Sequence, residues 1–327
     1  MREKLPIRAV ITGGAGFIGF HLGKKLVSMG WQVSLVDLKV PSTTDVEFHE
    51  LVQNNSVEYL QVDLTKNEQF EKLPDTDYVF HFAALNGTQN FYNTPHTVLV
   101  NSGIPIVALM ERYMGKAKFI YAGSSESYAP GIKYGITQIP TAENAAFIID
   151  EPSNPRWSYS MGKSFGEIAC QAYGSEYGKH SLILRFHNVY GPRMGINHVI
   201  PDVILNALEG KYVLNGWQNT RSFVFIDDAI EDVVGLATQF SFKETEVINL
   251  GSEDEISMLI LGEKILKLMN IDSEFELREA PKGSVSRRRP DLAVLTRILG
   301  DRKRVDLEVG LEQTLNWYRL NRKLYRN

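Results

Sequence analysis

Tyr159 and Lys163 are the two residues whose types and spacing best suit proton transfer. Asn154-Pro155 predicts a helix start with proline in the first turn, so the phenol and the ammonium would lie one turn apart on one face. An unperturbed tyrosine has a pKa near 10, and lowering it by roughly three units requires about 4 kcal/mol from nearby positive charge. Tyr159 would then be a general base for a substrate hydroxyl. The alternative is a surface tyrosine covered by the lysine stem.

A second reactive group, Ser124-Ser125-Glu126, follows a buried apolar run. We expect Ser124 to hydrogen-bond a reacting hydroxyl and orient it toward Tyr159. Glu126 is a candidate acid or base for a neighbouring carbon. The alternative is an ordinary serine-rich turn at a strand end.

A glycine-rich turn indicates a dinucleotide site that could work with this group. The apolar run 7–11 reads as a strand, glycines follow at positions 13, 16 and 19, and a periodic helix begins near Phe17 and Ile18. A second predicted strand, 32–36, ends at Asp37, where a carboxylate would bind the adenosine ribose and favour NAD over NADP. Lys39 leaves that preference open. The alternatives are an ordinary glycine-rich turn and a solvated carboxylate.

Five further apolar runs must position these residues. They alternate with segments long enough for crossover helices, which predicts an α/β fold with a doubly wound parallel (Rossmann) sheet and ligands beyond the carboxyl ends of its strands. The runs are 57–62, 78–82, 118–122, 182–186 and 247–250, the last returning to the sheet after an irregular stretch.

This alternation also predicts two units. We expect a dinucleotide-binding domain formed by residues 1–186 plus about 226–251. Residues 187–225 plus about 252–327 would form a smaller, mostly C-terminal lobe that binds substrate over the crevice.

Composition excludes several classes of protein. The chain has 327 residues, 43% of them hydrophobic, which is enough for a sizeable core. The net charge of −4, with acids and bases interspersed, argues against a nucleic-acid partner. The one dense basic cluster, Arg287-Arg288-Arg289, is either a phosphate contact or a solvated loop.

Cysteine usage and hydropathy indicate the compartment. The single cysteine, Cys170, cannot form an intrachain disulfide, and no Cys/His grouping has zinc-site spacing, so we expect no metal. No apolar run reaches the length of a membrane span. The sequence therefore predicts a soluble, cytoplasmic protein.

The motifs together resemble the nucleotide-sugar epimerase/dehydratase family, the extended short-chain dehydrogenases. The resemblance covers nearly the whole chain. It rests on eight motifs in the family's order: 12–19, Asp63-Leu64, His81-Phe82-Ala83-Ala84, Ser124-Ser125-Glu126, Tyr159 to Lys163, 188–193, 221–228 and Arg289-Pro290-Asp291.

This resemblance implies a tightly held NAD that is reduced and reoxidised in each cycle, and a nucleoside diphosphate sugar as substrate. Oxidation at C4 of the sugar would be followed by epimerisation, by loss of water across C5 and C6, or by loss of carbon dioxide from a uronic acid. Members that act at C5 or C6 need an acid at the position of Glu126. We therefore expect dehydratase-like chemistry, with a decarboxylase or a 4-epimerase as alternatives. A non-catalytic NAD sensor is the alternative from another class.

The resemblance also assigns residues. It implies a homodimer built from the helix bearing Tyr159 and a helix near 105–113. The implied cofactor contacts are Gly13, Gly16, Phe17, Ile18, Gly19, Asp37, Asp63, Leu64, Ala83, Tyr159 and Lys163. The implied substrate contacts are Ser125, Asn188, Arg193, Arg221 and Arg289.

Three segments depart from the family's pattern. Glu126 is followed by Ser127-Tyr128-Ala129-Pro130, where a valine or leucine, then tyrosine and glycine, is usual. The stretch 128–156 is longer than usual and would border the sugar. The run 86–92 is unusually polar and aromatic, and it is either part of the sugar pocket or a surface loop.

Overall fold

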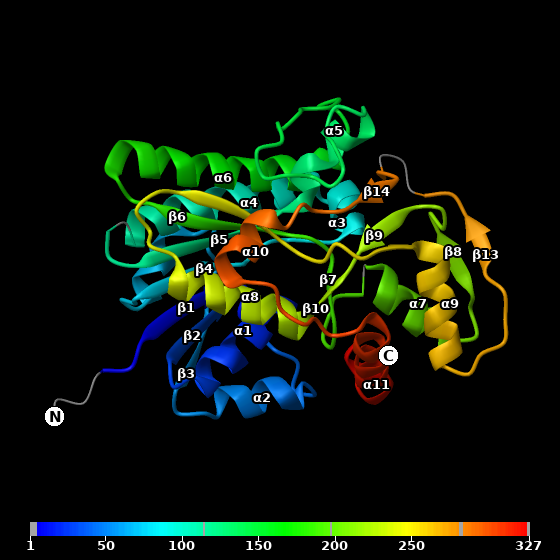
Figure 1. The fold of residues 1–327 in the computed structure, drawn as a ribbon. Coiled ribbons are helices and arrows are strands. Elements are labelled where there is room, and N and C mark those ends of the chain that lie inside the picture. Colours follow the sequence, from blue (N-terminus) through cyan, green and yellow to red (C-terminus); the bar gives the residue numbers. More distant parts are fainter. Residues whose placement is uncertain (1–4, 114, 197, 281–283, 326–327) are drawn as a thin grey trace.

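The seven predicted strands form one fully parallel sheet in the computed structural model (Figure 1), as the alternation of strands and helices predicts. The structure describes residues 5–113, 115–196, 198–280 and 284–325. Most strand residues are buried, since helices cover both faces of the sheet. The strands are β1 (Arg8–Thr12), β2 (Gln32–Asp37), β3 (Val57–Gln61), β4 (Tyr78–His81), β5 (Lys118–Ser124), β6 (Ser181–Phe186) and β11 (Glu246–Leu250).

The strand order creates a crevice at one edge of the sheet. The order is β11-β6-β5-β4-β1-β2-β3, so the chain winds outward from β1 to β3 and then crosses back to β4. The connections that leave β1 and β4 therefore diverge, which is where doubly wound sheets bind ligands. Ser124 ends β5, and Asp37 ends β2, at the same edge of the sheet.

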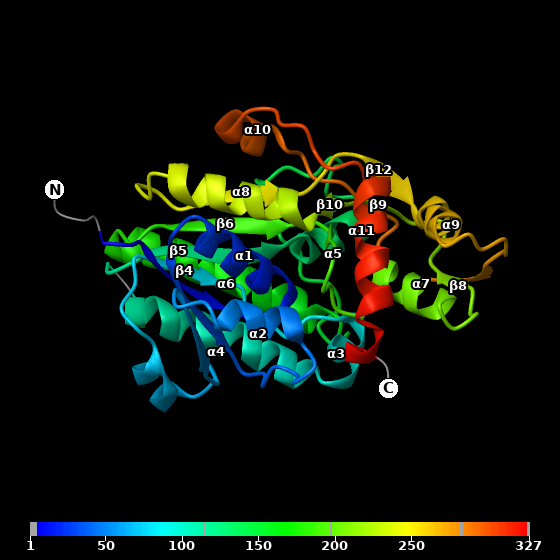
Figure 2. The ribbon, with the colours of Figure 1, turned by 90° about the horizontal axis from the view of Figure 1, so that it is seen from below.

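Two helical layers cover the sheet. Figure 2 shows α4 (Pro95–Tyr113) and α6 (Trp157–Tyr177) on one side, and α8 (Ile226–Gln239) and α10 (Ala293–Leu299) on the other. The helix α1 (Phe17–Ser28) packs against α8, and α2 (Val46–Val52) packs on β3. One apolar core lies beneath α4 and α6, while the other lies beneath α1 and α8 and continues into the C-terminal part of the chain.

The remaining elements extend beyond the carboxyl edge of the sheet (Figure 1). Three small sheets pair β7 with β10, β8 with β13, and β9 with both β12 and β14. Their strands are β7 (Val189–Tyr190), β8 (Val213–Asn215), β9 (Thr220–Ser222), β10 (Val224–Phe225), β12 (Glu255–Ser257), β13 (Glu276–Arg278) and β14 (Arg287–Arg288). The helices among them are α7 (Val199–Ala207), α9 (Met258–Leu268) and α11 (Leu307–Leu320), followed by the 3-10 turn η3 (Arg322–Leu324).

The division into two units stays a prediction. The helix α10 falls within the range assigned to the substrate lobe, yet it packs on α8 and β11 of the main sheet. The short elements that follow β4 and β5 are α3 (Thr88–Asn93), η2 (Ser125–Tyr128) and α5 (Ala129–Lys133), while η1 (Asn67–Lys72) lies between β3 and β4 in the chain and packs near α4. Within the described residues, no helix combines the length and apolar character required to cross a bilayer.

Candidate active site

The glycine turn after β1 has the close packing that a dinucleotide site requires. Gly13 has a φ of +74°, and a Cβ atom there would lie 2.9 Å from the Ala83 nitrogen at the end of β4. A Cβ on Gly19 would collide with the Gly13 carbonyl oxygen. Gly16 is the N-cap of α1, and no side chain caps this helix end. The first N–H groups of α1 are therefore available to a phosphate, as predicted.

Asp37 lies against this turn. Its carboxylate accepts hydrogen bonds from the backbone N–H of Ala15 (3.1 Å) and of Lys39 (3.0 Å). Both distances place the acid at the edge of the turn, where ribose hydroxyls would reach it. The residues present therefore fit an adenine dinucleotide.

The other implied cofactor residues follow β3 and β4. The carboxylate of Asp63 accepts from the N–H and the hydroxyl of Thr65, and the hydroxyl lowers its pKa. Leu64 is buried in the core beneath α4 and α6. The N–H of Ala83 donates to the Thr12 hydroxyl (3.1 Å), which ties the ends of β4 and β1 together.

Tyr159, Lys163 and Ser124 meet at the carboxyl end of β5, as the sequence predicts. Tyr159 and Lys163 are both buried on α6, one turn apart. Tyr159 shares a hydrogen bond with Ser124. The Lys163 Nζ atom donates to the Ala122 carbonyl (2.9 Å) and lies 5.9 Å from the centre of the Tyr159 ring. The helix begins at Trp157, slightly later than Asn154-Pro155 predicts, because these two residues form a turn that leads into it.

The expected lowering of the tyrosine pKa is not produced by the chain alone. Burial raises the pKa of Tyr159 well above its usual value, and the nearby Glu126 carboxylate raises it further, against the lowering effect of the Ser124 hydroxyl. Lys163 does not offset this rise, and its ammonium donates to the Ala122 carbonyl. Additional positive charge must therefore come from a bound group if Tyr159 is to ionise.

Glu126 lies in a cluster of arginines that the motif analysis missed. Arg288 Nη1 lies 2.7 Å from one carboxylate oxygen of Glu126, and Arg156 Nη2 lies 3.3 Å from the other. Burial works to raise the pKa of Glu126, but Arg288, then Arg156, then Arg221 outweigh it and hold this pKa at about 2. Glu126 is therefore a carboxylate at neutral pH, and the group carries a net positive charge.

Arg221 belongs to the same cluster. Arg221 and Arg288 are paired residues of the adjacent strands β9 and β14. Burial, followed by the charge of Arg288, lowers the pKa of Arg221 to about 9. Its guanidinium donates to the carbonyls of Thr220 (2.7 Å) and Val285 (2.8 Å). The predicted contact Arg221 is thus brought into the site.

Arg289 lies elsewhere. Its side chain is one-third exposed, and it reaches Glu253 at 4.0 Å rather than Glu126. Successive residues of an extended segment point to opposite sides, so Arg288 is the member of the basic run that reaches the carboxylate. The Nε atoms of Arg156 and Arg288 are buried and have no hydrogen-bond partner within the described part of the chain.

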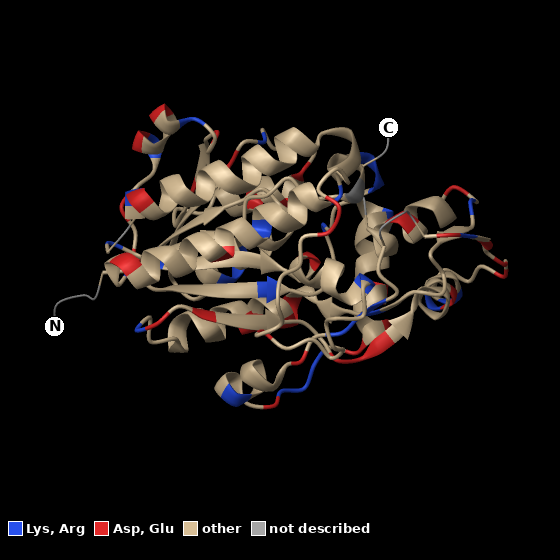
Figure 3. Ribbon diagram, turned by 90° about the horizontal axis from the view of Figure 1, so that it is seen from above, with Lys and Arg blue, Asp and Glu red and all other residues tan. Residues whose placement is uncertain are grey.

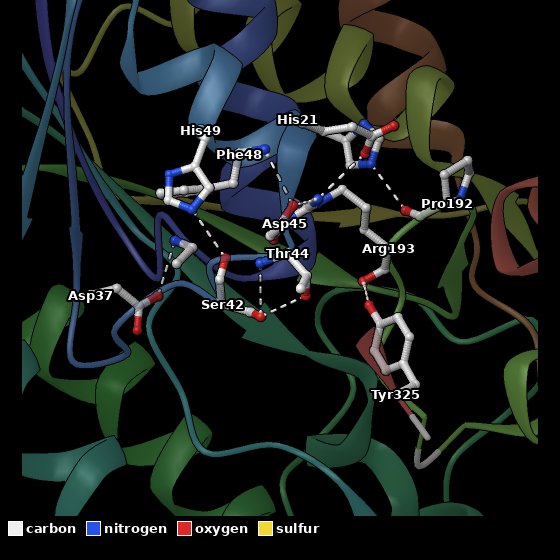
Figure 4. Close-up of polar contacts among 12 residues, drawn as sticks. His21, Asp37, Ser42, Thr44, Asp45, Phe48, His49, Pro192, Arg193 and Tyr325 are labelled. Atoms are coloured by element: carbon white, nitrogen blue, oxygen red, sulfur yellow. Dashed lines mark hydrogen bonds and ion pairs between the residues drawn. The ribbon is translucent and has the colours of Figure 1, made fainter. Parts of the chain in front are cut away.

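Arg193 is also held away from the Glu126 cluster. Figure 4 shows it turned toward Asp45, whose two oxygens lie 2.7 and 2.6 Å from its terminal nitrogens. The guanidinium also stacks on Phe20, with 4.0 Å to the ring centre. In the same view Tyr325 donates to the Arg193 carbonyl, and His21 contacts the Pro192 carbonyl. A substrate contact by Arg193 stays a prediction and would require this ion pair to open.

The two other implied contacts frame the site. Ser125 is buried at the start of η2, next to Glu126. Asn188 has a φ of +36° and donates to the Ser222 carbonyl (2.9 Å), so it ties β7 to β9.

The aromatic run 86–92 is part of the site and not a simple surface loop. The ring of Phe91 is buried and stacks on Tyr159, with ring centres 4.8 Å apart and planes 19° apart. Tyr92 shares a hydrogen bond with Arg156. The aromatic residues of this run indicated a role in the sugar pocket. Their contacts with Tyr159 and Arg156 could not be predicted, because these contacts depend on how α3 packs against α6.

A doubly wound sheet with this glycine turn, and with a buried tyrosine and lysine beyond the neighbouring strand, defines an enzyme of the dinucleotide-dependent redox type. Comparison with known proteins gives the family. Residues 9–251 match the model of the NAD dependent epimerase/dehydratase family.

Two relatives and a solved structure illustrate the similarity. UDP-N-acetyl-alpha-D-glucosaminuronate decarboxylase of Bacillus cytotoxicus is 32% identical, with 95% of this chain and 98% of that protein covered. GDP-mannose 3,5-epimerase 1 of Oryza sativa subsp. indica is 30% identical over 96% and 82% of the two chains. UDP-glucose 4-epimerase of Thermotoga maritima has 26% identity and a TM-score of 0.83, with 96% and 99% covered.

The chain belongs to the NAD dependent epimerase/dehydratase family of nucleotide-sugar enzymes, and NAD is its cofactor. Its relatives include a decarboxylase, an epimerase and a dehydratase, so membership of the family does not identify which reaction this chain catalyses.

Proposed function

We propose that this enzyme decarboxylates a nucleoside diphosphate hexuronic acid after oxidation at C4 of the sugar. The observation that carries the proposal is the cluster of Arg156, Arg221 and Arg288 around a single carboxylate, Glu126, beside Ser124. Two buried guanidinium groups, Arg156 and Arg288, and the partly buried Arg221 are opposed by one anion, which favours a substrate that brings a second carboxylate. A decarboxylase that acts on such a substrate is among the relatives of the chain.

The state of Glu126 supports loss of carbon dioxide over loss of water. Elimination of water requires a proton donor for the departing hydroxyl, and a carboxyl with a pKa of about 2 is a poor donor at neutral pH. A 4-keto hexuronic acid is a β-keto acid, whose C5–C6 bond breaks with the electron pair moving into a C4–C5 enolate. This step needs stabilisation of the C4 oxygen and no acid at C6. Carbon dioxide leaves, and a proton is then added at C5.

The residues around Tyr159 suit the flanking steps. NAD, when bound, accepts the C4 hydride and returns it. Tyr159 would take the C4 hydroxyl proton, and the Ser124 hydroxyl would hold that oxygen and later stabilise the enolate. Phe91 covers the Tyr159 ring and excludes water from it.

Dehydration remains the second candidate, because Glu126 could act as a base on the C5 proton. A panel of UDP-, GDP- and dTDP-linked hexoses and hexuronic acids, with products analysed by mass spectrometry, separates the candidates. We expect loss of carbon dioxide from hexuronic acids and no reaction with neutral hexoses. Loss of water from neutral hexoses would contradict the proposal, as would products of unchanged mass.

We also propose that two copies of the chain pair through α4 and α6. These helices carry few charges (Figure 3) and expose Leu99, Ile104, Phe165 and Ile168 around a groove that Gly103 and Gly162 help to line. An exposed apolar surface of this kind favours an interface. Phe165→Glu should convert a dimer into a monomer in sedimentation experiments, whereas Leu277→Glu, on exposed β13, should not. A wild-type monomer would contradict this.

A cytoplasmic location also stays a proposal. It is supported by Cys170, which is buried and free.

A further inference from the structure

The catalytic helix carries a third buried charged residue in line with the catalytic pair. Tyr159, Lys163 and Glu167 follow one another at intervals of four, so they lie along one face of α6. Lys163 and Glu167 are each only 3% exposed. Lysine and glutamate side chains are rarely buried in a folded protein unless they are paired. Two of them on one helical face therefore require an explanation.

The ammonium of Lys163 has neutral neighbours except on one side. His81 of β4 faces it and is held neutral, because burial lowers the pKa of this histidine to about 3. Tyr121 of β5 lies with its ring centre 5.1 Å from the lysine nitrogen, and burial raises its pKa. Tyr159 is likewise protonated in the absence of a bound cation. In the described part of the chain, Glu167 is the anion that acts on Lys163.

The Glu167 carboxylate and this ammonium lie over adjacent residues of β5. Lys163 donates to the Ala122 carbonyl, and Glu167 occupies the space above the next residue, Gly123, where a Cβ atom would lie 2.8 Å from its oxygen. Arg185 of β6 binds the other side of the carboxylate, with its Nη2 2.7 Å and its Nε 3.0 Å from the same oxygen. The carboxylate is therefore ion-paired with Arg185 and lies one helical turn from Lys163.

Arg185 is itself fixed, so it acts as a clamp. It donates to the Tyr128 hydroxyl and to the Glu143 carbonyl (2.7 Å). Its guanidinium also lies 4.7 Å from the centre of the Phe147 ring. Burial raises the pKa of Glu167, while the hydrogen bonds and charge of Arg185, followed by the charge of Lys163, work to lower it. Paired N–H groups of a guanidinium favour the ionised form of the carboxyl that they bind.

We propose that Glu167 is a positioning residue for catalysis: its carboxylate, clamped by Arg185, supplies the negative charge that keeps the buried Lys163 ammonium protonated. Burial lowers the pKa of Lys163 to about 8, and Glu167 opposes that decrease. The pKa of Lys163 is therefore only a little above neutral pH. Loss of the Glu167 charge should therefore bring this pKa closer to neutral pH, and a Lys163 that has lost its proton is a weaker donor to the Ala122 carbonyl and to the cofactor that it is expected to contact. The inference does not depend on which sugar is bound.

The direct test is an NMR titration of Lys163 in cofactor-free protein labelled with ε-¹³C lysine, with the resonance assigned from Lys163→Arg. We expect Glu167→Gln to lower the midpoint by about 1 pH unit or more. Glu167→Asp keeps the charge and should restore most of the shift. Glu143→Gln is the matched control: its carboxylate accepts from the Asn249 N–H (2.9 Å) in the same network but does not act on Lys163.

A second readout is the pH dependence of turnover with UDP-glucuronic acid as probe. If the charged form of Lys163 is the active one, the alkaline limit of activity should lie at lower pH in Glu167→Gln than in the wild type. If Glu167→Gln does not fold, the double variant Glu167→Gln/Arg185→Met removes the pair without leaving a lone buried charge. A folded variant of either kind with an unshifted Lys163 midpoint would overturn the proposal. Failure of the decarboxylase proposal would instead appear only in the identity of the products.

Discussion

Replacing Arg288 by methionine removes the closest cation from Glu126 while keeping most of the length of the side chain. Arg288 lies 2.7 Å from the carboxylate and is the strongest of the three charges that lower its pKa. The decrease from 4.5 to about 2 corresponds to about 3 kcal/mol in favour of the ionised form, after the opposing effect of burial. We therefore expect Arg288→Met to raise the pKa of Glu126 by at least about 1 unit.

The same substitution should alter substrate selection. A hydrogen bond to a charged group contributes about 1.5 to 3 kcal/mol, so kcat/KM for a hexuronic acid should decrease roughly 10- to 150-fold. The dissociation constant of a neutral hexose linked to the same nucleoside, which should bind without reacting, should change little. The assays are kcat/KM for UDP-glucuronic acid, measured from pH 5 to 9, and the ratio of the dissociation constants of UDP-glucuronic acid and UDP-glucose in calorimetry.

Arg287→Met provides the control. Arg287 is the preceding residue of β14, its side chain is half exposed, and it pairs with Glu255 on the outside of the site. An exposed pair of this kind contributes about 0 to 1 kcal/mol, so this variant should behave like the wild type. The reasoning fails if Arg288→Met folds and keeps the wild-type preference, or if both variants lose it equally.

Three further outcomes follow from the site and its core. Tyr159→Phe keeps the ring stacked on Phe91, so it should bind NAD normally in calorimetry but lose roughly 10²- to 10⁴-fold in turnover; near-normal turnover would remove Tyr159 as the base. Gly19→Ala places a methyl group against the Gly13 carbonyl, so both NAD affinity and Tm should decrease, and unchanged NAD affinity would contradict the assigned turn. The buried His81 has its pKa lowered to about 3, so the unfolded chain binds a proton from pH 6.5 downward while the folded chain does not. His81 should therefore account for about 2 kcal/mol of the stability lost between pH 7 and pH 5 in urea unfolding, so His81→Gln should lose about 2 kcal/mol less than the wild type; equal losses in both proteins would argue against this.

The sheet and the proton-transfer pair could be predicted because their signals are local. A short apolar run marks each strand, and the spacing of Tyr159 and Lys163 places both on one helical face. The glycine turn is local in the same sense, since Gly13, Gly16 and Gly19 act within one strand–turn–helix unit.

The arginine cluster could not be predicted because it depends on tertiary register. Only the pairing of β14 with β9 determines that Arg288, and not Arg289, faces Glu126. Arg156 reaches the same carboxylate from the turn before α6, and no periodicity marks it. Arg193 is the opposite case: its motif predicted a substrate contact, but its guanidinium is ion-paired with Asp45, which is distant in the sequence.

The direction in which the pKa of Tyr159 shifts could not be predicted from the sequence either. Nearby positive charge was expected to lower it, but the pKa of a phenol buried beneath Phe91 rises, and the ammonium of Lys163 is directed to a carbonyl. Burial and the orientation of a flexible lysine are both set by the completed fold.

The most direct test of the account uses a hexuronic acid substrate that carries deuterium at C4 of the sugar. Oxidation, decarboxylation and return of the same hydride within one site predict a product that has lost carbon dioxide and retained the deuterium at C4. A product that keeps its carboxylate, or one that loses carbon dioxide together with the deuterium, would contradict it.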